Sequence, residues 1–131
     1  MFLEFFMEVF FIRIKLHGYI ENITKNFKEE IDTKAIKDKN IIKFVYRDVN
    51  YKIMINKDKI KLTRENQEFF HEFEFILNKE TKSIYYVKEL NTELEIMVLS
   101  NKVISNEKKI VIEYIVKESS EKYKYYIEMS E

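Results

Sequence analysis

Apolar and polar residues alternate with a period of two along most of the chain. Between residues 12 and 20, Ile12, Ile14, Leu16 and Ile20 alternate with polar or charged side chains, a pattern typical of a β-strand with one buried and one solvated face. The same alternation predicts strands over residues 27–36, 41–47, 51–55, 60–64, 84–90, 94–98, 110–116 and 123–129. Short connections over residues 37–40, 56–58, 78–81, 105–108 and 118–121 supply the polar turn residues between them.

Residues 65–77 fit two patterns. Phe69, Phe70, Phe73, Ile76 and Leu77 recur at helical spacing, whereas Phe69, His71, Phe73, Phe75 and Leu77 recur at strand spacing. We predict a strand, because Phe75 interrupts the helical face and the segment lies among hairpins. On this strand His71 shares the inward face of the phenylalanines.

About nine or ten short strands joined by short turns predict an antiparallel meander. The 131 residues suit one domain with one core. A flat sheet of this size would leave two exposed edges and an unfilled face, which favours closure. We therefore predict an all-β fold, a single antiparallel meander β-barrel of about 8–10 strands over residues 11–131, with residues 1–10 as an N-terminal extension.

The chain has one glycine, Gly18, and no proline. Gly18 falls on the dry side of the first strand, where a missing side chain permits a bend or a close crossing. Asn and Asp are therefore expected at turn positions that need a positive φ angle.

The first ten residues are rich in apolar side chains, but they do not have the pattern of an export signal. Glu4 and Glu8 interrupt the apolar run, no basic residue precedes it, and no small-residue cleavage site follows. We therefore expect a cytoplasmic protein. A further hypothesis is that translation starts at Met7.

The charge balance and the absence of cysteine exclude several classes of partner and of chemical site. Twenty-three basic and 23 acidic residues cancel, so we expect no nucleic-acid and no membrane partner. The absence of cysteine excludes disulfides, thiolate catalysis and cysteine metal sites. Two histidines, His17 and His71, lie in unrelated segments and have no metal-ligand spacing, so no metal or other cofactor is expected.

Lys, Ile, Asn, Phe and Tyr make up more than half of the residues. All five have A/T-rich codons, which indicates an A/T-rich bacterial genome. The large number of lysines therefore says little about function.

Five segments carry a resemblance to a known family. They are residues 12–18, residues 41–48 with Tyr46 and Asp48, residues 60–64, Tyr86 before a turn, and residues 110–114 before the final strand. In this order they resemble the YwiB-like family of small uncharacterised bacterial proteins, over nearly the full chain. The resemblance implies a calycin-like (lipocalin-like) β-barrel and no particular reaction.

The polar residues on the inward faces suggest where a ligand would bind. Arg64 continues the apolar face of Ile60 and Leu62, where an unpaired guanidinium is costly. It either pairs with an internal carboxylate or carbonyl groups, or anchors the acidic head of a lipid-like ligand. His71 fits a satisfied core residue, and His17 belongs to the solvated face. The candidate ligand-binding residues are Arg64, His71, Tyr86, Tyr46, Phe73 and Tyr114.

Three functions follow from these observations. The first is a non-enzymatic protein that binds a small amphipathic or apolar ligand in the barrel interior. The alternative is a protein-interaction module, as a homodimer, that acts through the outward apolar residues Phe11, Met97, Leu99, Ile115 and Tyr126. The third, a hydrolase, is disfavoured, because no serine stands in a glycine-flanked elbow and Glu72, Glu74, Glu93 and Glu95 are expected on the outer wall. We therefore expect no catalytic residues and no enzyme activity.

Overall fold

Ten strands follow one another along residues 12–131, the part of the chain that the computed structural model describes. They are β1 (Ile12–Asn22), β2 (Phe27–Asp38), β3 (Ile41–Tyr46), β4 (Val49–Asn56), β5 (Lys59–Glu65), β6 (Phe69–Ile76), β7 (Glu80–Val87), β8 (Thr92–Ser105), β9 (Lys109–Val116) and β10 (Lys122–Ser130). Each pairs antiparallel with its neighbours in sequence, and β1 also pairs with β10, which closes the barrel. The predicted all-β antiparallel meander barrel is confirmed. The described residues form no helix long and apolar enough to cross a membrane.

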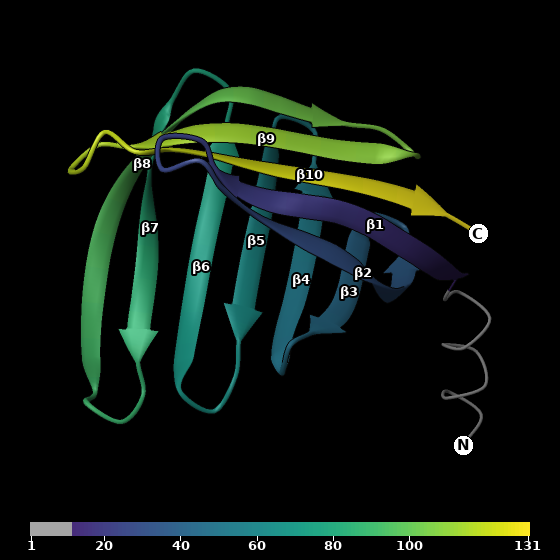
Figure 1. The fold of residues 1–131 in the computed structure, drawn as a ribbon, viewed down its shortest axis with the longest axis horizontal. Coiled ribbons are helices and arrows are strands. Elements are labelled where there is room, and N and C mark those ends of the chain that lie inside the picture. Colours follow the sequence, from purple (N-terminus) through teal and green to yellow (C-terminus); the bar gives the residue numbers. More distant parts are fainter. Residues whose placement is uncertain (1–11) are drawn as a thin grey trace.

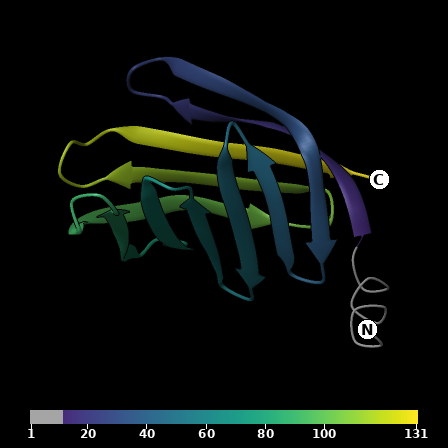
Figure 2. The same ribbon diagram turned by 90° about the horizontal axis from the view of Figure 1, so that it is seen from below.

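The strands form two layers that cross steeply. Strands β3 to β7 run across β1, β2, β9 and β10 (Figure 1). Two long strands connect the layers: β2 bends from one to the other (Figure 2), and β8 pairs first with β7 and then with β9. A register shift between Ser100 and Lys102 marks the corner in β8, as bulges commonly do. The prediction ended this strand at Val98, because the bulge breaks the alternation just beyond it.

The predicted strand over residues 65–77 is β6, and the helical alternative is wrong. Strands β5 and β7 flank this segment and pair with it on both sides. Its inward side chains include His71, Phe73 and Phe75, which are at most 8% exposed, whereas Leu77 lies beyond the strand and is 48% exposed. Every second side chain from His71 to Phe75 is therefore buried in the core, as the alternation in the sequence predicts.

Turns with a positive φ angle occur without glycine. Asn26, Asp48, Asn78 and Asn91 adopt it, as expected, but Lys39, Arg47 and Ser120 do so too. The expectation that Asn and Asp fill these positions is therefore only partly right, because short hairpins impose the backbone angle on whichever residue is present. Arg47 and Asp48 form a two-residue loop with φ angles of 49° and 63°, the geometry of a type I′ turn.

Gly18 lies where β1 and β10 close the barrel, and its predicted role in a close crossing is confirmed. A Cβ atom at this position would lie 1.9 Å from the carbonyl oxygen of Tyr126 and 2.9 Å from the Cα of Ile127. Both are backbone atoms, which cannot rotate away. The φ angle of Gly18 is not positive, so the position requires the missing side chain and not an unusual backbone angle.

Replacing Gly18 is expected to destabilise the barrel strongly. In Gly18→Ala the new methyl group must push β10 away from β1, which should lower the free energy of unfolding by about 3 kcal/mol or more. His17→Ala, one residue away on the exposed face, should change it by less than about 0.5 kcal/mol. Urea unfolding followed by circular dichroism compares the two. Equal stabilities would contradict the close crossing.

The turn between β3 and β4 gives a second test. Asp48→Gly removes the cost of a left-handed angle and should raise the free energy of unfolding by about 0.5–1 kcal/mol. The matched control is Asp58→Gly in the turn between β4 and β5, where φ is not positive and glycine only adds freedom to the unfolded chain. Thermal unfolding should therefore shift upwards for the first variant and downwards or not at all for the second. The reverse order would exclude the type I′ geometry.

Candidate functional site

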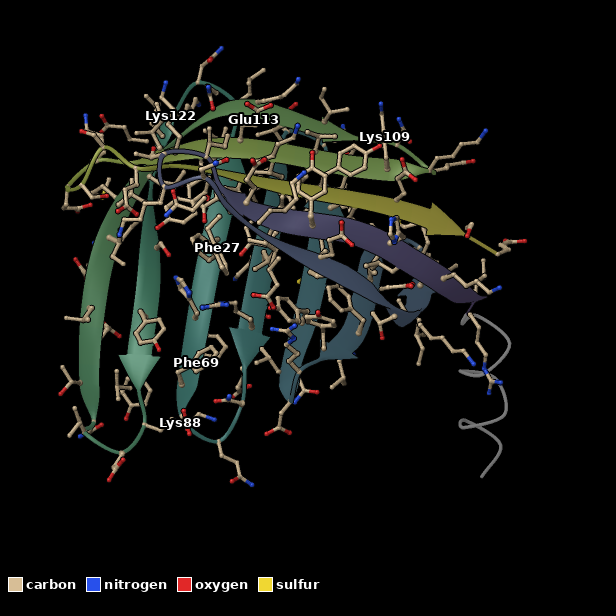
Figure 3. All side chains as sticks on the ribbon, in the orientation of Figure 1. Phe27, Phe69, Lys88, Lys109, Glu113 and Lys122 are labelled. Atoms are coloured by element: carbon tan, nitrogen blue, oxygen red, sulfur yellow. The ribbon has the colours of Figure 1, made fainter. Side chains whose placement is uncertain are left out.

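The inner face of the barrel is packed at one end and uncovered at the other. Leu16, Ile42 and Phe75 are fully buried in the packed part. Leu94 lies opposite Tyr85 on the inner side of β8 and yet is 53% exposed. The ends of β5 to β8 extend beyond the crossing strands (Figure 1), and Phe69 lies in this extended part of β6 (Figure 3). An apolar surface is therefore accessible next to the core.

Arg64 lies at the border between these two parts. It continues the inner face of β5, as predicted, and its cross-strand neighbours are Tyr51 on β4 and His71 on β6. Its guanidinium carbon is 5.1 Å from the centre of the Phe69 ring. Among residues 12–131 no carboxylate lies within ion-pairing distance of Arg64. The internal carboxylate that one interpretation of the sequence expected is therefore not found in the described residues.

A chain of three hydrogen bonds runs from Arg64 to the backbone of β6. Arg64 Nε donates to His71 Nδ1 at 3.3 Å, and His71 Nε2 lies 2.9 Å from Ser83 Oγ, which donates to the Glu72 carbonyl oxygen at 3.0 Å. An arginine can only donate, so Nδ1 must accept and the proton of neutral His71 is on Nε2. Every polar hydrogen in the chain then has an acceptor.

The same contacts keep His71 neutral. Burial, and then the positive charge of Arg64, lower the pKa of His71 to about 3. A serine nucleophile needs the opposite arrangement, with an acceptor nitrogen toward the hydroxyl and a carboxylate behind the ring. Ser83 is also fully buried. The 2.9 Å contact between His71 and Ser83 is thus a structural hydrogen bond with the wrong polarity for nucleophile activation.

Tyrosines on three other strands surround the guanidinium. Burial lowers the pKa of Arg64, but Tyr125, Tyr51 and Tyr114 together raise it more, so that Arg64 stays charged. Burial raises the pKa of Tyr125 to about 12 and also raises that of Tyr114, so these hydroxyls remain neutral. We call Arg64, His71, Tyr51, Tyr114 and Tyr125 the Arg64 site. It places one positively charged group beside a neutral histidine and three tyrosines.

The structure brings together four of the six predicted ligand-binding residues. Arg64 and His71 bond directly, the His71 ring lies 4.0 Å from that of Phe73, and Phe73 lies 5.6 Å from Tyr114. Tyr46 faces inward elsewhere, and its hydroxyl donates to the Glu30 carbonyl oxygen at 2.7 Å, tying β3 to β2.

Tyr86 is not part of this group, because it lies on the outer side of β7, where its hydroxyl bonds to Asn91. Its neighbour Tyr85 takes the inner position, 5.1 Å from the ring of His71. The prediction that Tyr86 faces the interior is therefore wrong, because the strand register gives the inner position to Tyr85.

Sequence analysis missed Tyr51, Ser83 and Tyr125. The predicted turn at residues 56–58 carries only a partial signal for Tyr51: centred on Lys57 it would place Tyr51 opposite Thr63, whereas the actual two-residue loop of Lys57 and Asp58 places it opposite Arg64. Ser83 contacts His71 across the hairpin of β6 and β7, whereas Tyr125 reaches the site through the pairing of β10 with β1, which no local pattern predicts.

Residues of the predicted interaction surface lie on the outside of β8 to β10. Met97, Leu99, Ile115 and Tyr126 are all partly buried, and Tyr126 stacks on Tyr19 at 5.3 Å. Phe11 lies outside the described residues, as do residues 1–10 and the suggested start at Met7. Within residues 12–131 no three histidine or acidic side chains gather into a group that could hold a metal ion.

Comparison with known proteins gives a structural likeness but no match to the sequence. No family model matches the sequence, and no curated protein matches it. The crystal structure of the ywiB protein from Bacillus subtilis is similar over 92% of each chain, with a TM-score of 0.63 and 15% sequence identity. At this identity the likeness shows the fold alone. The chain thus shares its barrel fold with the ywiB protein.

Proposed function

We propose that this protein is a non-catalytic binding protein for a small amphipathic anion. The acidic head of the ligand binds at the Arg64 site, and its apolar part lies along the uncovered inner face. The observation that carries the proposal is a charged guanidinium on the inner face with no carboxylate partner among residues 12–131. The proposal includes cytoplasmic location and divergent membership of the YwiB-like family, with a calycin-like barrel.

The chemistry of Arg64 favours a carboxylate or phosphate group. Its Nε is used by His71 and Tyr51 also hydrogen-bonds to the guanidinium, but no carboxylate does, so its planar terminal amino groups can bind the oxygens of an anion. Glu29 lies opposite Ile20 on the inner side of β2, but it pairs with Arg47 at 3.4 Å. The internal charge of Arg64 is therefore left for a ligand.

The apolar part of the ligand has a surface next to this charge. Phe69 packs against Tyr85, with ring centres 5.5 Å apart, and both rings are partly exposed. Leu94, which lies opposite Tyr85 and is 53% exposed, extends the same surface. Binding sites for small molecules commonly combine such an apolar lining with few polar anchors.

A hydrolase and an interaction module are less favoured. The pair of His71 and Ser83 has the wrong polarity for a nucleophile, since Arg64 stands where a carboxylate is needed. For the interaction module, the four described residues of the outer surface are partly buried against their neighbours. Neither alternative explains why a cation lies unpaired on the inner face.

Binding of a fluorescent fatty acid tests the proposal. Arg64→Met should weaken binding of dansyl-undecanoic acid by about 10- to 100-fold, because it removes a charge-assisted hydrogen-bonded pair. It should change the free energy of unfolding by no more than about 1–2 kcal/mol, because the loss of an unpaired internal charge offsets the loss of the hydrogen bond to His71. Lys57→Met, which removes an exposed cation in the turn between β4 and β5, is the matched control and should bind normally. If the wild-type protein shows no saturable binding, or Arg64→Met binds equally well, the proposal is wrong.

Acid should destabilise the barrel through His71. The pKa of His71 is about 3 in the folded protein, below the ordinary value of 6.5, so its neutral form favours folding. This contribution is complete above pH 6.5 and is lost as the pH falls toward 3. Between pH 7 and pH 4.5 the loss should be about 2–3 kcal/mol in the free energy of unfolding.

Two glutamine variants isolate this contribution. His71→Gln should lose less stability between the two pH values than the wild-type protein, while the exposed His17→Gln should match the wild type. Urea unfolding at both pH values gives the differences, in which the contributions of the carboxylates cancel. A pH dependence unchanged in His71→Gln would refute the neutral buried histidine.

A further inference from the structure

A groove of about 890 Å³ runs across the outer face of β1 to β5. The strand register arranges its outward lining residues in two rows on either side of the buried Ile14, Ala35, Phe44 and Tyr51. One row contains Arg13, Ile36, Lys43, Lys52 and Thr63, and the other contains Lys15, Lys34, Val45, Asn50 and Glu65. The groove thus lies on the opposite side of the barrel wall from the Arg64 site.

The groove gathers positive charge on a chain whose net charge is zero. Arg13, Lys15, Lys34, Lys43 and Lys52 line it, together with the acidic residues Glu65 and Glu131. None of the five cations has an ion-pair partner among residues 12–131. The carboxylate of Glu65 is already paired with Lys88 at 2.8 Å.

The register also places like charges directly opposite each other. Lys15 faces Lys34 across β1 and β2, and Lys43 faces Lys52 across β3 and β4. Such pairs destabilise a sheet. The paired strands of the described barrel contain two directly opposed pairs of like charge, and both of them lie in this groove.

The rest of the outer wall follows the opposite rule. Lys61 lies across from Glu74, Glu128 from Lys109, and Lys102 from Glu113, which it contacts at 3.5 Å. Elsewhere on the described barrel, charges that lie directly opposite each other are therefore of opposite sign. The groove departs from that pattern, and local departures of this kind mark functional sites more often than random positions.

We propose that this groove binds a small molecule that carries two or more phosphate groups. Phosphate oxygens would lie between the opposed lysines and relieve their repulsion, with Arg13 able to bind two oxygens at once. Adjacent strands are about 4.8 Å apart, so the four strands that carry the cations span a few linked phosphates. The exposed Ile36 and Val45, 44% and 57% exposed, lie between the charges and suit an organic part of the ligand.

A single-stranded nucleic acid fits this surface less well. Such ligands are held largely by bases that stack on aromatic side chains. The aromatic residues that line the groove, Phe44 and Tyr51, are at most 6% exposed and stack on each other at 4.7 Å. The groove therefore offers charge and aliphatic surface but no accessible ring.

The test uses inorganic tripolyphosphate and two charge reversals. Lys43→Glu should weaken tripolyphosphate binding by at least about 10-fold in isothermal titration calorimetry at physiological ionic strength. Without ligand, the same substitution should raise the melting temperature by about 1–4 °C, because it replaces a repulsive cross-strand pair with an attractive one.

Lys61→Glu is the control, since it changes the net charge equally but lies outside the groove and breaks the contact with Glu72. It should lower the melting temperature and leave tripolyphosphate binding within about 2-fold of the wild type. The proposal is overturned if the wild-type protein does not bind tripolyphosphate saturably. It is also overturned if the two reversals weaken binding equally, because net charge alone would then explain the effect.

Discussion

The closure of the barrel between its first and last strands is the constraint on which the other features depend. Eight residue pairs join β1 to β10, and the approach is so close that Gly18 can carry no side chain against the backbone of Tyr126. Without this contact both strands would be open edges. Closure also fixes which side of every strand faces inward, so it determines the surroundings of Arg64 and the composition of the outer groove.

The period of two predicts most of this fold. It correctly assigned β6, where the phenylalanines also fit a helix, because only a strand can complete the hydrogen bonds of its neighbours. It failed where the backbone changes direction. The second half of β8 was missed, since the register shift between Ser100 and Lys102 exchanges the inward and outward positions that a regular alternation assumes.

The Arg64 site could be predicted only in part, because alternation predicts the face of each residue on a regular strand but not which strands and residues lie side by side. Arg64 and His71 lie on strands whose alternation is clear, and their inward positions are confirmed. Tyr125 completes the site through a strand pairing that depends on closure and on the total register around the barrel. Tyr85 and Tyr86 show the limit most simply: a shift by one residue exchanges their faces, and no turn residue nearby fixes the choice.

The abundance of lysine and its placement have different causes. The codon bias of the chain accounts for the number of lysines, and this number alone says nothing about function. Placement is set by the strand register, which puts Lys61 and Lys102 next to glutamates and yet leaves Lys15 opposite Lys34 and Lys43 opposite Lys52. Since a single lysine-to-glutamate change would remove each repulsion, a mutational bias toward lysine does not explain why both repulsive pairs line the same groove. An anion bound between the lysines explains their position, because each repulsive pair then binds the anion and its repulsion is relieved.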